Sequence, residues 1–119
     1  MPQRPDRLRL TDMIEAAEAI IEAVGGLTRE EFYADQRLQY AVLWCFTKLG
    51  ESASTLTPEL RTRHATVSWR DASAFRNRAV HGYFDIEADI VLNAARQHVP
   101  QLIEDLRAVL AKEFPEELT

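Results

Sequence analysis

The 119-residue chain has few cysteines, glycines and prolines and no long apolar run, and each of these absences excludes a class of protein or site. Its one cysteine, Cys45, excludes an intrachain disulfide framework and a zinc site built from several cysteines. It has only four glycines and five prolines, and neither glycine-rich phosphate-binding motif is present. The longest apolar run, residues 41–46, is far too short to span a membrane, and no signal peptide is visible. We expect a single domain over residues 1–119, located in the reducing cytoplasm without contact to a membrane.

Charge is unevenly distributed along the chain. The net charge is −5, which argues mildly against a nucleic-acid coat protein. Residues 1–59 sum to −4 and residues 83–119 to −5, whereas residues 60–82 carry five arginines and one aspartate, or +4. This positive segment is either a solvated face or a site for an anion such as an RNA phosphate. We expect His64 and His98 to be exposed and without a role.

Apolar residues recur at steps of three and four along most of the chain, a pattern that predicts amphipathic helices. The stripes cover residues 10–24, 38–56 and 86–110, and no segment alternates convincingly with the two-residue period of a strand. Typical start and stop residues lie between and within them: Gly25-Gly26, Thr28 with Glu31, Asp35, Thr57-Pro58, Ser68 and Pro100. We predict an all-α fold, an antiparallel up-and-down bundle of four to five main helices with the last helix kinked or broken before Pro100.

The apolar run at residues 41–46 surrounds the whole circumference of its predicted helix. It belongs either to the centre of the bundle or to a contact between subunits. We expect Tyr33 and Tyr40 to be packing residues. Cys45 is expected to be a small buried hydrophobic residue rather than a nucleophile.

Residues 76–83, Arg-Asn-Arg-Ala-Val-His-Gly-Tyr, are hard to explain as packing residues. They offer two guanidiniums, an amide, an imidazole and a phenol. Asn77 and His81 are four residues apart, so on a helix they share one face. Arg76 and His81 converge on one ligand only if the helix ends near His81 or if a second chain completes the site. Spacing alone also fits an arginine and a histidine that bind the free carbonyls of a helix end.

This segment resembles the R-N-x-x-x-H-x-Y motif of the HepT-like toxins, which are members of the HEPN superfamily. The resemblance extends to residues 49–53, Leu-Gly-Glu-Ser-Ala, which are similar to the family's I-G-E-A segment, to Trp69, and to the Asp-Ile…Pro-x-Leu pattern of residues 85–102. It implies a small homodimeric toxin that cleaves RNA without a metal or other cofactor. It also implies a partner, a minimal nucleotidyltransferase antitoxin, which transfers AMP from ATP to the motif tyrosine, here Tyr83.

The motif residues also fit this chemistry by their types. His81 can take the proton of the attacking 2′-hydroxyl, because histidine titrates near neutrality. Arg76 offers a planar fork for phosphate oxygens, and Asn77 can hold the imidazole in one tautomer. By resemblance, Glu51 supports Arg76 or His81 through a hydrogen bond, although by itself it also fits an ordinary acid on a helix surface. Arg78 departs from the family pattern, because it adds a charge to the variable part of the motif, and we count it as a supporting residue. No metal site is expected, since the three histidines lack the spacing of a metal-binding motif.

A second interpretation is a non-catalytic dimeric module that binds nucleotide or a partner, or that only accepts AMP. The acidic total and the single motif histidine favour this alternative slightly, whereas the intact motif favours an enzyme. One chain supplies one motif histidine, although acid and base roles ideally need two groups. A dimer with two copies of His81 in one cleft would supply both.

Overall fold

The computed structural model describes residues 4–81 and 88–118, and for residues 76–81, 88, 117 and 118 it describes the backbone alone. These ranges contain helices and no strand. Five of the seven α-helices have ten or more residues, which confirms the predicted all-α bundle of four to five main helices. The elements are α1 (Asp6–Val24), α2 (Arg29–Ala34), α3 (Gln36–Thr55), α4 (Pro58–Arg63), α5 (Trp69–His81), α6 (Ala88–Gln97), α7 (Val99–Glu113) and the 3-10 helix η1 (Pro115–Leu118).

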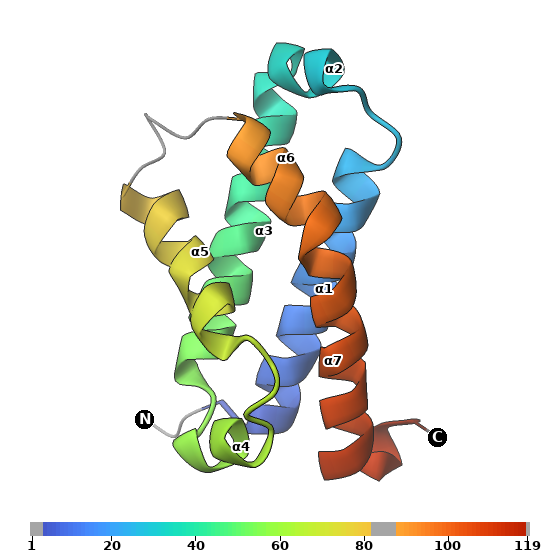
Figure 1. Cartoon of the computed structure of the whole chain (residues 1–119). Coiled ribbons are helices and arrows are strands. Elements are labelled where there is room, and N and C mark those ends of the chain that lie inside the picture. The colour runs from blue at the N-terminus through green and yellow to red at the C-terminus, as the bar shows by residue number, and fades with distance from the viewer. Residues whose placement is uncertain (1–3, 82–87, 119) are drawn as a thin grey trace.

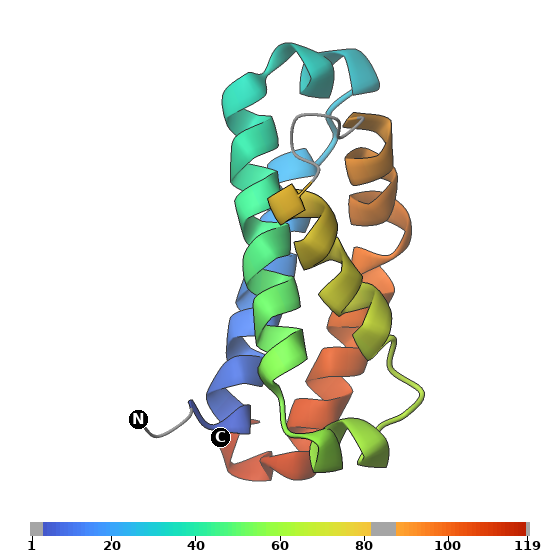
Figure 2. The ribbon, with the colours of Figure 1, turned by 90° about the vertical axis from the view of Figure 1, so that its left-hand side faces the viewer.

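The long helices run up and down along the bundle (Figure 1). α1 and α5 run in one direction, and α3 and the α6–α7 pair run in the other. α3 packs against both α1 and α5, whereas α7 packs mainly against α1. Helix α5 is therefore held chiefly by α3 (Figure 2). None of the helices in the described ranges is both long and apolar enough to cross a membrane.

α1 contributes a continuous stripe to the core, and a glycine ends it. Its buried side chains follow the predicted spacing of three and four residues: Leu10, Met13, Ala16, Ala17, Ile20 and Val24. Gly25 has a φ of +33° and donates its N–H to the carbonyl oxygen of Ile21 at 2.9 Å. A side chain at this φ would be strained, so the predicted glycine stop is confirmed.

Two local caps set the boundaries of α2 and α3. The Oγ1 of Thr28 accepts the N–H of Glu31 at 3.1 Å, and the Glu31 carboxylate accepts the N–H of Thr28 at 2.9 Å, which completes the predicted capping box. These hydrogen bonds hold the pKa of Glu31 below its usual range. Asp35 accepts the N–H of Leu38 at 3.0 Å and so caps α3, as expected.

The start of α4 has the predicted cap residue, Thr57, and the predicted proline. Pro58 lies in the first turn, but the Thr57 side chain makes no cap hydrogen bond. Its Oγ1 instead donates to one carboxylate oxygen of Asp6 at 2.6 Å, and its N–H donates to the other at 3.1 Å. Thr57 is thus the cap residue, as predicted, but the carboxylate at the start of α1, and not the backbone of α4, binds its side chain.

A break separates the last two helices at the place that Pro100 predicts. α6 ends at Gln97, and α7 begins at Val99 with Pro100 in its first turn. His98 lies between them, and its N–H and carbonyl bond to α6 and α7 respectively. The proline has no N–H to continue the earlier helix, so the chain changes direction here.

Candidate active site

Helix α5 begins at a tryptophan that is anchored to the preceding turn. Trp69 is buried, and its indole Nε1 donates a hydrogen bond to the carbonyl oxygen of His64 at 3.0 Å. The carbonyl of Ser68 accepts the N–H of Ala72 at 3.1 Å. The predicted helix start after Ser68 is confirmed. The helix that carries the motif thus has a fixed origin well before the motif begins.

An aromatic pair joins α5 to α3. The ring centroids of Phe75 on α5 and Phe46 on α3 are 4.9 Å apart, and the ring planes are tilted by 44°. Tilted aromatic pairs at this separation are favourable beyond the area that they bury. Because the two helices run in opposite directions (Figure 2), residues after Phe75 lie beside residues that precede Phe46. The last turns of α5 therefore run alongside the middle of α3.

The backbone of α5 carries three of the four defined motif residues, and also Arg78 from the variable part of the motif. Arg76, Asn77, Arg78 and His81 belong to its final turns, and His81 is its last residue. Their side chains lie outside the described residues, as does Tyr83 as a whole. Because residues 82–87 also lie outside the described residues, the convergence of Arg76 and His81 on one ligand stays a prediction.

A row of aromatic and basic side chains is exposed along α3, and the sequence analysis missed it. Tyr40 and Trp44 are 54% and 68% exposed. Arg37 and Lys48 are also exposed and share the spacing of three and four residues with them. Tyr33 on α2 is 47% exposed. The expectation that Tyr33 and Tyr40 are packing residues is wrong. Phe32 is the buried residue of α2, and aliphatic side chains and Phe46 fill the inner side of α3.

The apolar run at residues 41–46 is divided between the inside and the outside of the bundle. Val42 and Phe46 are buried in the core, whereas Ala41 and Trp44 are exposed. One side of this segment therefore lies at the centre of the bundle, which was one of the two predicted alternatives. The other side presents a large indole that lacks a covering element among the described residues.

Comparison with known proteins identifies the family. The family model "Ribonuclease HepT-like" matches residues 13–109, which is most of the chain. The chain belongs to the HepT-like ribonuclease family. Its family is therefore one of ribonucleases. The resemblance that residues 76–83 indicate is confirmed.

Several relatives of this HepT-like chain align over most of their lengths. A protein of Thermococcus cleftensis named "Probable ribonuclease HepT" is 26% identical over 93 residues, which cover 78% of this chain and 84% of the relative. A protein of Caldanaerobacter subterraneus, named as a candidate RNase, is 28% identical and covers 87% of this chain and 93% of its own length. A protein of Methanocaldococcus jannaschii, also named as a candidate RNase, is 26% identical, and the alignment covers 92% of this chain and 91% of the relative. No solved structure matches the chain.

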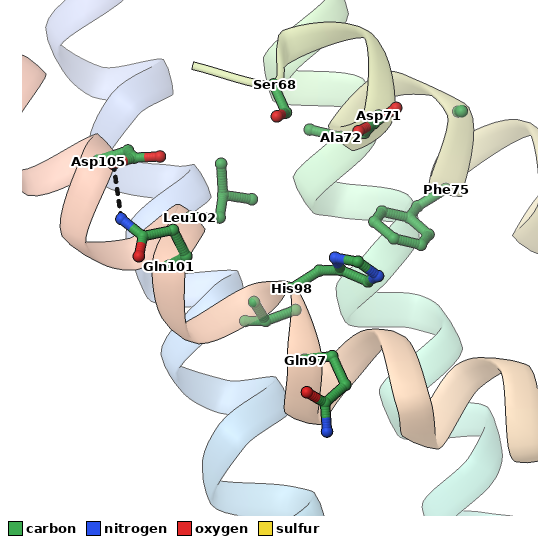
Figure 3. Close-up of a pocket in the computed structure, with 11 residues that line it drawn as sticks. Ser68, Asp71, Ala72, Phe75, Gln97, His98, Gln101, Leu102 and Asp105 are labelled. Carbon is green, nitrogen blue, oxygen red and sulfur yellow. Dashed lines mark hydrogen bonds between the residues drawn. The ribbon is translucent and has the colours of Figure 1, made fainter. Parts of the chain in front are cut away.

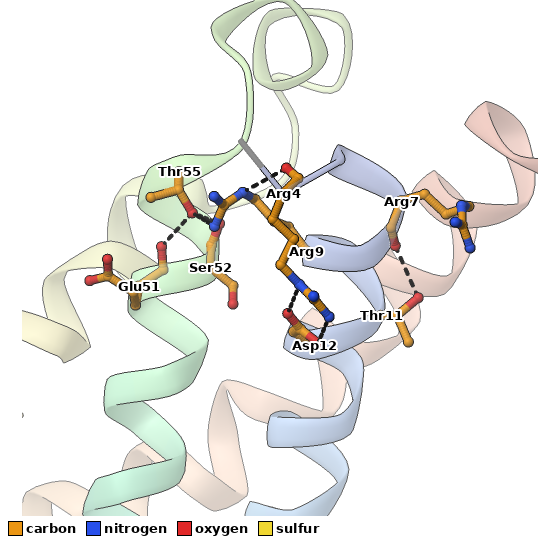
Figure 4. Close-up of polar contacts among 8 residues, drawn as sticks. All are labelled: Arg4, Arg7, Arg9, Thr11, Asp12, Glu51, Ser52 and Thr55. Carbon is orange, nitrogen blue, oxygen red and sulfur yellow. Dashed lines mark hydrogen bonds and ion pairs between the residues drawn. The ribbon is translucent and has the colours of Figure 1, made fainter. Parts of the chain in front are cut away.

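Glu51 lies on the exposed side of α3, in the segment that resembles the HepT-like pattern I-G-E-A. Its backbone carbonyl accepts hydrogen bonds from Ser54 Oγ at 3.0 Å and Thr55 Oγ1 at 2.8 Å. Thr55 in turn accepts a hydrogen bond from the Arg9 guanidinium, which ties this end of α3 to α1. Figure 4 shows the Glu51 carboxylate directed away from α1. Glu51 is thus presented on a firmly held part of α3.

The described side chains of the positive segment, residues 60–75, are only partly solvated. Arg63 pairs with Glu113 of α7 at 2.7 Å and, with a smaller contribution from His64, holds the pKa of Glu113 below its usual range. His64 is half-buried, with Nε2 3.5 Å from the same carboxylate, so the expectation of an exposed His64 is wrong. The Nε of Arg61 is buried without a hydrogen-bond partner among the described residues. Arg70, at the start of α5, is exposed.

Cys45 is half-buried and packs against the hydrophobic core. Burial raises the pKa of its thiol, and the nearby Lys48 opposes this rise only in part. A raised pKa lowers the thiolate fraction at neutral pH and therefore the nucleophilicity of the sulfur. The structure supports a packing role, although the side chain is less deeply buried than the sequence predicted.

A cleft of about 570 Å³ separates α5 from the junction of α6 and α7. We call it the α5–α7 cleft. Figure 3 shows His98 beside Phe75, with Asp71 on one wall and Asp105 on the other. His98 is exposed, as expected, but it lines this cleft. Sequence analysis could not find the cleft, because its walls come from segments about 30 residues apart and no motif links them.

Proposed function

We propose that this HepT-like protein is the toxin of a toxin–antitoxin module, a metal-independent endoribonuclease that acts as a homodimer in the cytoplasm. The observation that carries the proposal is the intact Arg-Asn-x-x-x-His-x-Tyr motif, residues 76–83, in a chain of a ribonuclease family. The helix that bears most of this motif is anchored at Trp69 and packed on α3. Such support is what a site needs for side chains to keep a reactive geometry.

In the proposed reaction, the 2′-hydroxyl of the RNA attacks the adjacent phosphorus and the 5′-oxygen of the next nucleotide leaves. His81 takes the 2′-hydroxyl proton, and an imidazolium supplies a proton to the leaving oxygen. Arg76 binds the phosphate oxygens on which charge develops. Asn77 orients the imidazole, while Glu51 and Arg78 support the site. The product is a 2′,3′-cyclic phosphate, and the two proton transfers balance.

Two chains complete this site in the proposal, because each contributes one His81. The exposed aromatic side of α3 supports an interface next to the motif. Tyr40 and Trp44 there have large exposed surfaces, and exposed aromatic groups of this size favour protein contacts. This side of α3 is level with the last turns of α5, so a second copy seated on it brings the two motifs together.

The proposed partner is a minimal nucleotidyltransferase antitoxin that attaches AMP to Tyr83. The tyrosine oxygen attacks the α-phosphorus of ATP, pyrophosphate leaves, and the phenolic proton is lost. The product carries a bulky anion two residues after His81, where the RNA phosphate would bind. Blockage and like-charge repulsion then both oppose RNA binding.

The alternative is a non-catalytic dimeric module that binds nucleotide or the partner, or that only accepts AMP. The net charge of −5 supports it, since a negative surface repels RNA. Both interpretations share the partner and the dimer. They differ in whether the motif histidine performs chemistry.

Growth of cells that express the protein tests the proposed toxin. We expect the wild type to arrest growth, and His81→Ala and Arg76→Ala each to abolish the arrest while the protein stays folded. Circular dichroism and light scattering check the fold and the oligomeric state of each variant. A folded variant that is still fully toxic would contradict the assignment, as would loss of toxicity that is due only to unfolding.

A further inference from the structure

Five exposed side chains follow one another along the outer side of α3, and we call them the α3 row. Successive members are three or four residues apart, so they share one side of the helix. The row consists of Arg37, Tyr40, Trp44, Lys48 and Glu51. The other sides of α3 pack on α1 and α5. The row is therefore a surface that a second molecule can contact along several turns.

The two cations of the row have no carboxylate partner within the described part of the chain. Other cations behave differently, because Arg29, Arg63 and Arg107 each pair with a carboxylate of another helix. Arg37 and Lys48 lie instead on either side of the two exposed aromatic rings. They are available to the carboxylates and rings of a partner.

The spacing of the row is symmetric about Trp44. Arg37 and Glu51 both lie about 10 Å from it along the helix, and Tyr40 and Lys48 both lie about 6 Å from it. A two-fold axis that relates two antiparallel copies of α3 at Trp44 therefore puts Arg37 level with the partner's Glu51. It also puts Tyr40 level with the partner's Lys48. Both contacts are attractive, the first as an ion pair and the second as a cation–π contact.

The same charges oppose a parallel arrangement of the two helices. A parallel contact would place Arg37 beside the partner's Arg37 and Glu51 beside the partner's Glu51, and like charges at close range repel.

The positions of the neighbouring helices also favour the antiparallel arrangement. α1 and α5 pack on different sides of α3 (Figure 1). The two-fold axis of an antiparallel α3 pair keeps α5 on the same side of both copies, whereas the axis of a parallel pair puts the two α5 helices on opposite sides. An antiparallel contact therefore suits a cleft that two motif helices share.

We infer that two copies of the chain dimerise through an antiparallel contact of α3 on α3 centred on Trp44, in which Arg37 pairs with the partner's Glu51 and Lys48 lies on the ring of the partner's Tyr40. This inference rests on the proposed function, which includes the homodimer, and adds its orientation and register. A carboxylate accepts several hydrogen bonds, so Glu51 binds the partner's Arg37 and still supports the motif. The partner's Arg37 is then a positioning residue of the site.

Charge exchange in the full-length protein tests the register, and analytical ultracentrifugation measures the dimer dissociation constant. Arg37→Glu and Glu51→Arg each place like charges opposite one another at both ends of the contact, and the variant with both substitutions restores opposite charges. Lys112→Glu is the matched control, because it reverses an exposed cation at the end of α7, away from the α3 row. Circular dichroism checks that each variant is folded.

We expect Arg37→Glu and Glu51→Arg each to weaken the dimer by at least about tenfold, and the double variant to return to within about threefold of the wild type. Lys112→Glu should dimerise like the wild type. High salt should reduce the differences between variants, because it screens the charges at the ends of the contact.

If both single variants dimerise as tightly as the wild type, the antiparallel register is wrong while the homodimer stands, because a parallel contact places each residue beside its own copy. A double variant that dimerises more weakly than either single variant would show that the two residues do not pair, and would also overturn the register. A monomeric wild type would contradict the proposed homodimer, and this inference would fail with it.

Discussion

At the scale of single residues, the partners of a side chain explain where prediction from sequence succeeds and fails. His64 looks solvent-exposed in a polar turn, yet it lies against Glu113, which is 49 residues away in the chain. Tyr40 looks like a packing residue in a helical stripe, yet it is more than half exposed. Both errors arise because the environment of each side chain is set by elements that are distant in sequence. The motif residues could be singled out because they are adjacent and chemically unusual.

Tyr83 is the residue whose proposed role is most directly measurable. We expect co-expression with the proposed nucleotidyltransferase antitoxin to add the mass of AMP to the wild type, because Tyr83 occupies the tyrosine position of the Arg-Asn-x-x-x-His-x-Tyr motif. Intact-mass spectrometry measures the adduct, with Tyr83→Phe as the control. An unmodified wild type, or an adduct that persists in Tyr83→Phe, would show that the site assignment is wrong.

At the scale of helices, the boundaries that could be predicted are those whose signals are local. The capping box of Thr28 and Glu31, the Asp35 cap, the Gly25 stop and the break before Pro100 each depend on residues within one turn. Thr57 has the same local signal for a side-chain cap, but the distant Asp6 binds its hydroxyl. A local pattern therefore predicts where a helix starts better than it predicts which atoms cap it.

The contact between α3 and α5 is the element-scale feature that supports the site. We expect Phe46→Ala to lower the free energy of unfolding by about 3 kcal/mol, because it removes a buried ring and its contact with Phe75. Urea denaturation measures the change. The control is Lys48→Ala on the exposed side of α3, with an expected change within about 0.5 kcal/mol.

Comparison of the two variants tests whether the contact between α3 and α5 holds the motif helix. If Phe46→Ala were no more destabilising than Lys48→Ala, the packing of α5 on α3 would not be the contact that holds the motif helix.

At the scale of the whole molecule, the sequence predicts the main helices and their up-and-down order but not which side of each helix is left uncovered. Periodicity shows that residues 41–46 are apolar all round, and it cannot show that α1 and α5 cover only part of α3. The exposed indole of Trp44 and the α5–α7 cleft both follow from this arrangement. Neither has a signal in the sequence, because each depends on how helices from different parts of the chain pack.

The exposed side of α3 predicts how the protein assembles. We expect a homodimer at micromolar concentration, and we expect Trp44→Glu to shift the light-scattering mass to that of a monomer, because a charge would have to be buried in the interface. Ile90→Glu on α6 is the matched control, since Ile90 is also a large exposed apolar residue, and it should remain a dimer. A wild type that is monomeric across the accessible range would contradict the proposed dimer.

The central claim is that the motif performs metal-independent RNA cleavage, and one assay tests it most directly. Purified wild type and His81→Ala are incubated with single-stranded RNA in the presence of excess chelator, and the products are resolved by size and end chemistry. We expect the wild type to cleave the RNA to 2′,3′-cyclic phosphate ends and folded His81→Ala to leave it intact. Loss of wild-type cleavage on addition of chelator, or equal cleavage by His81→Ala, would contradict it.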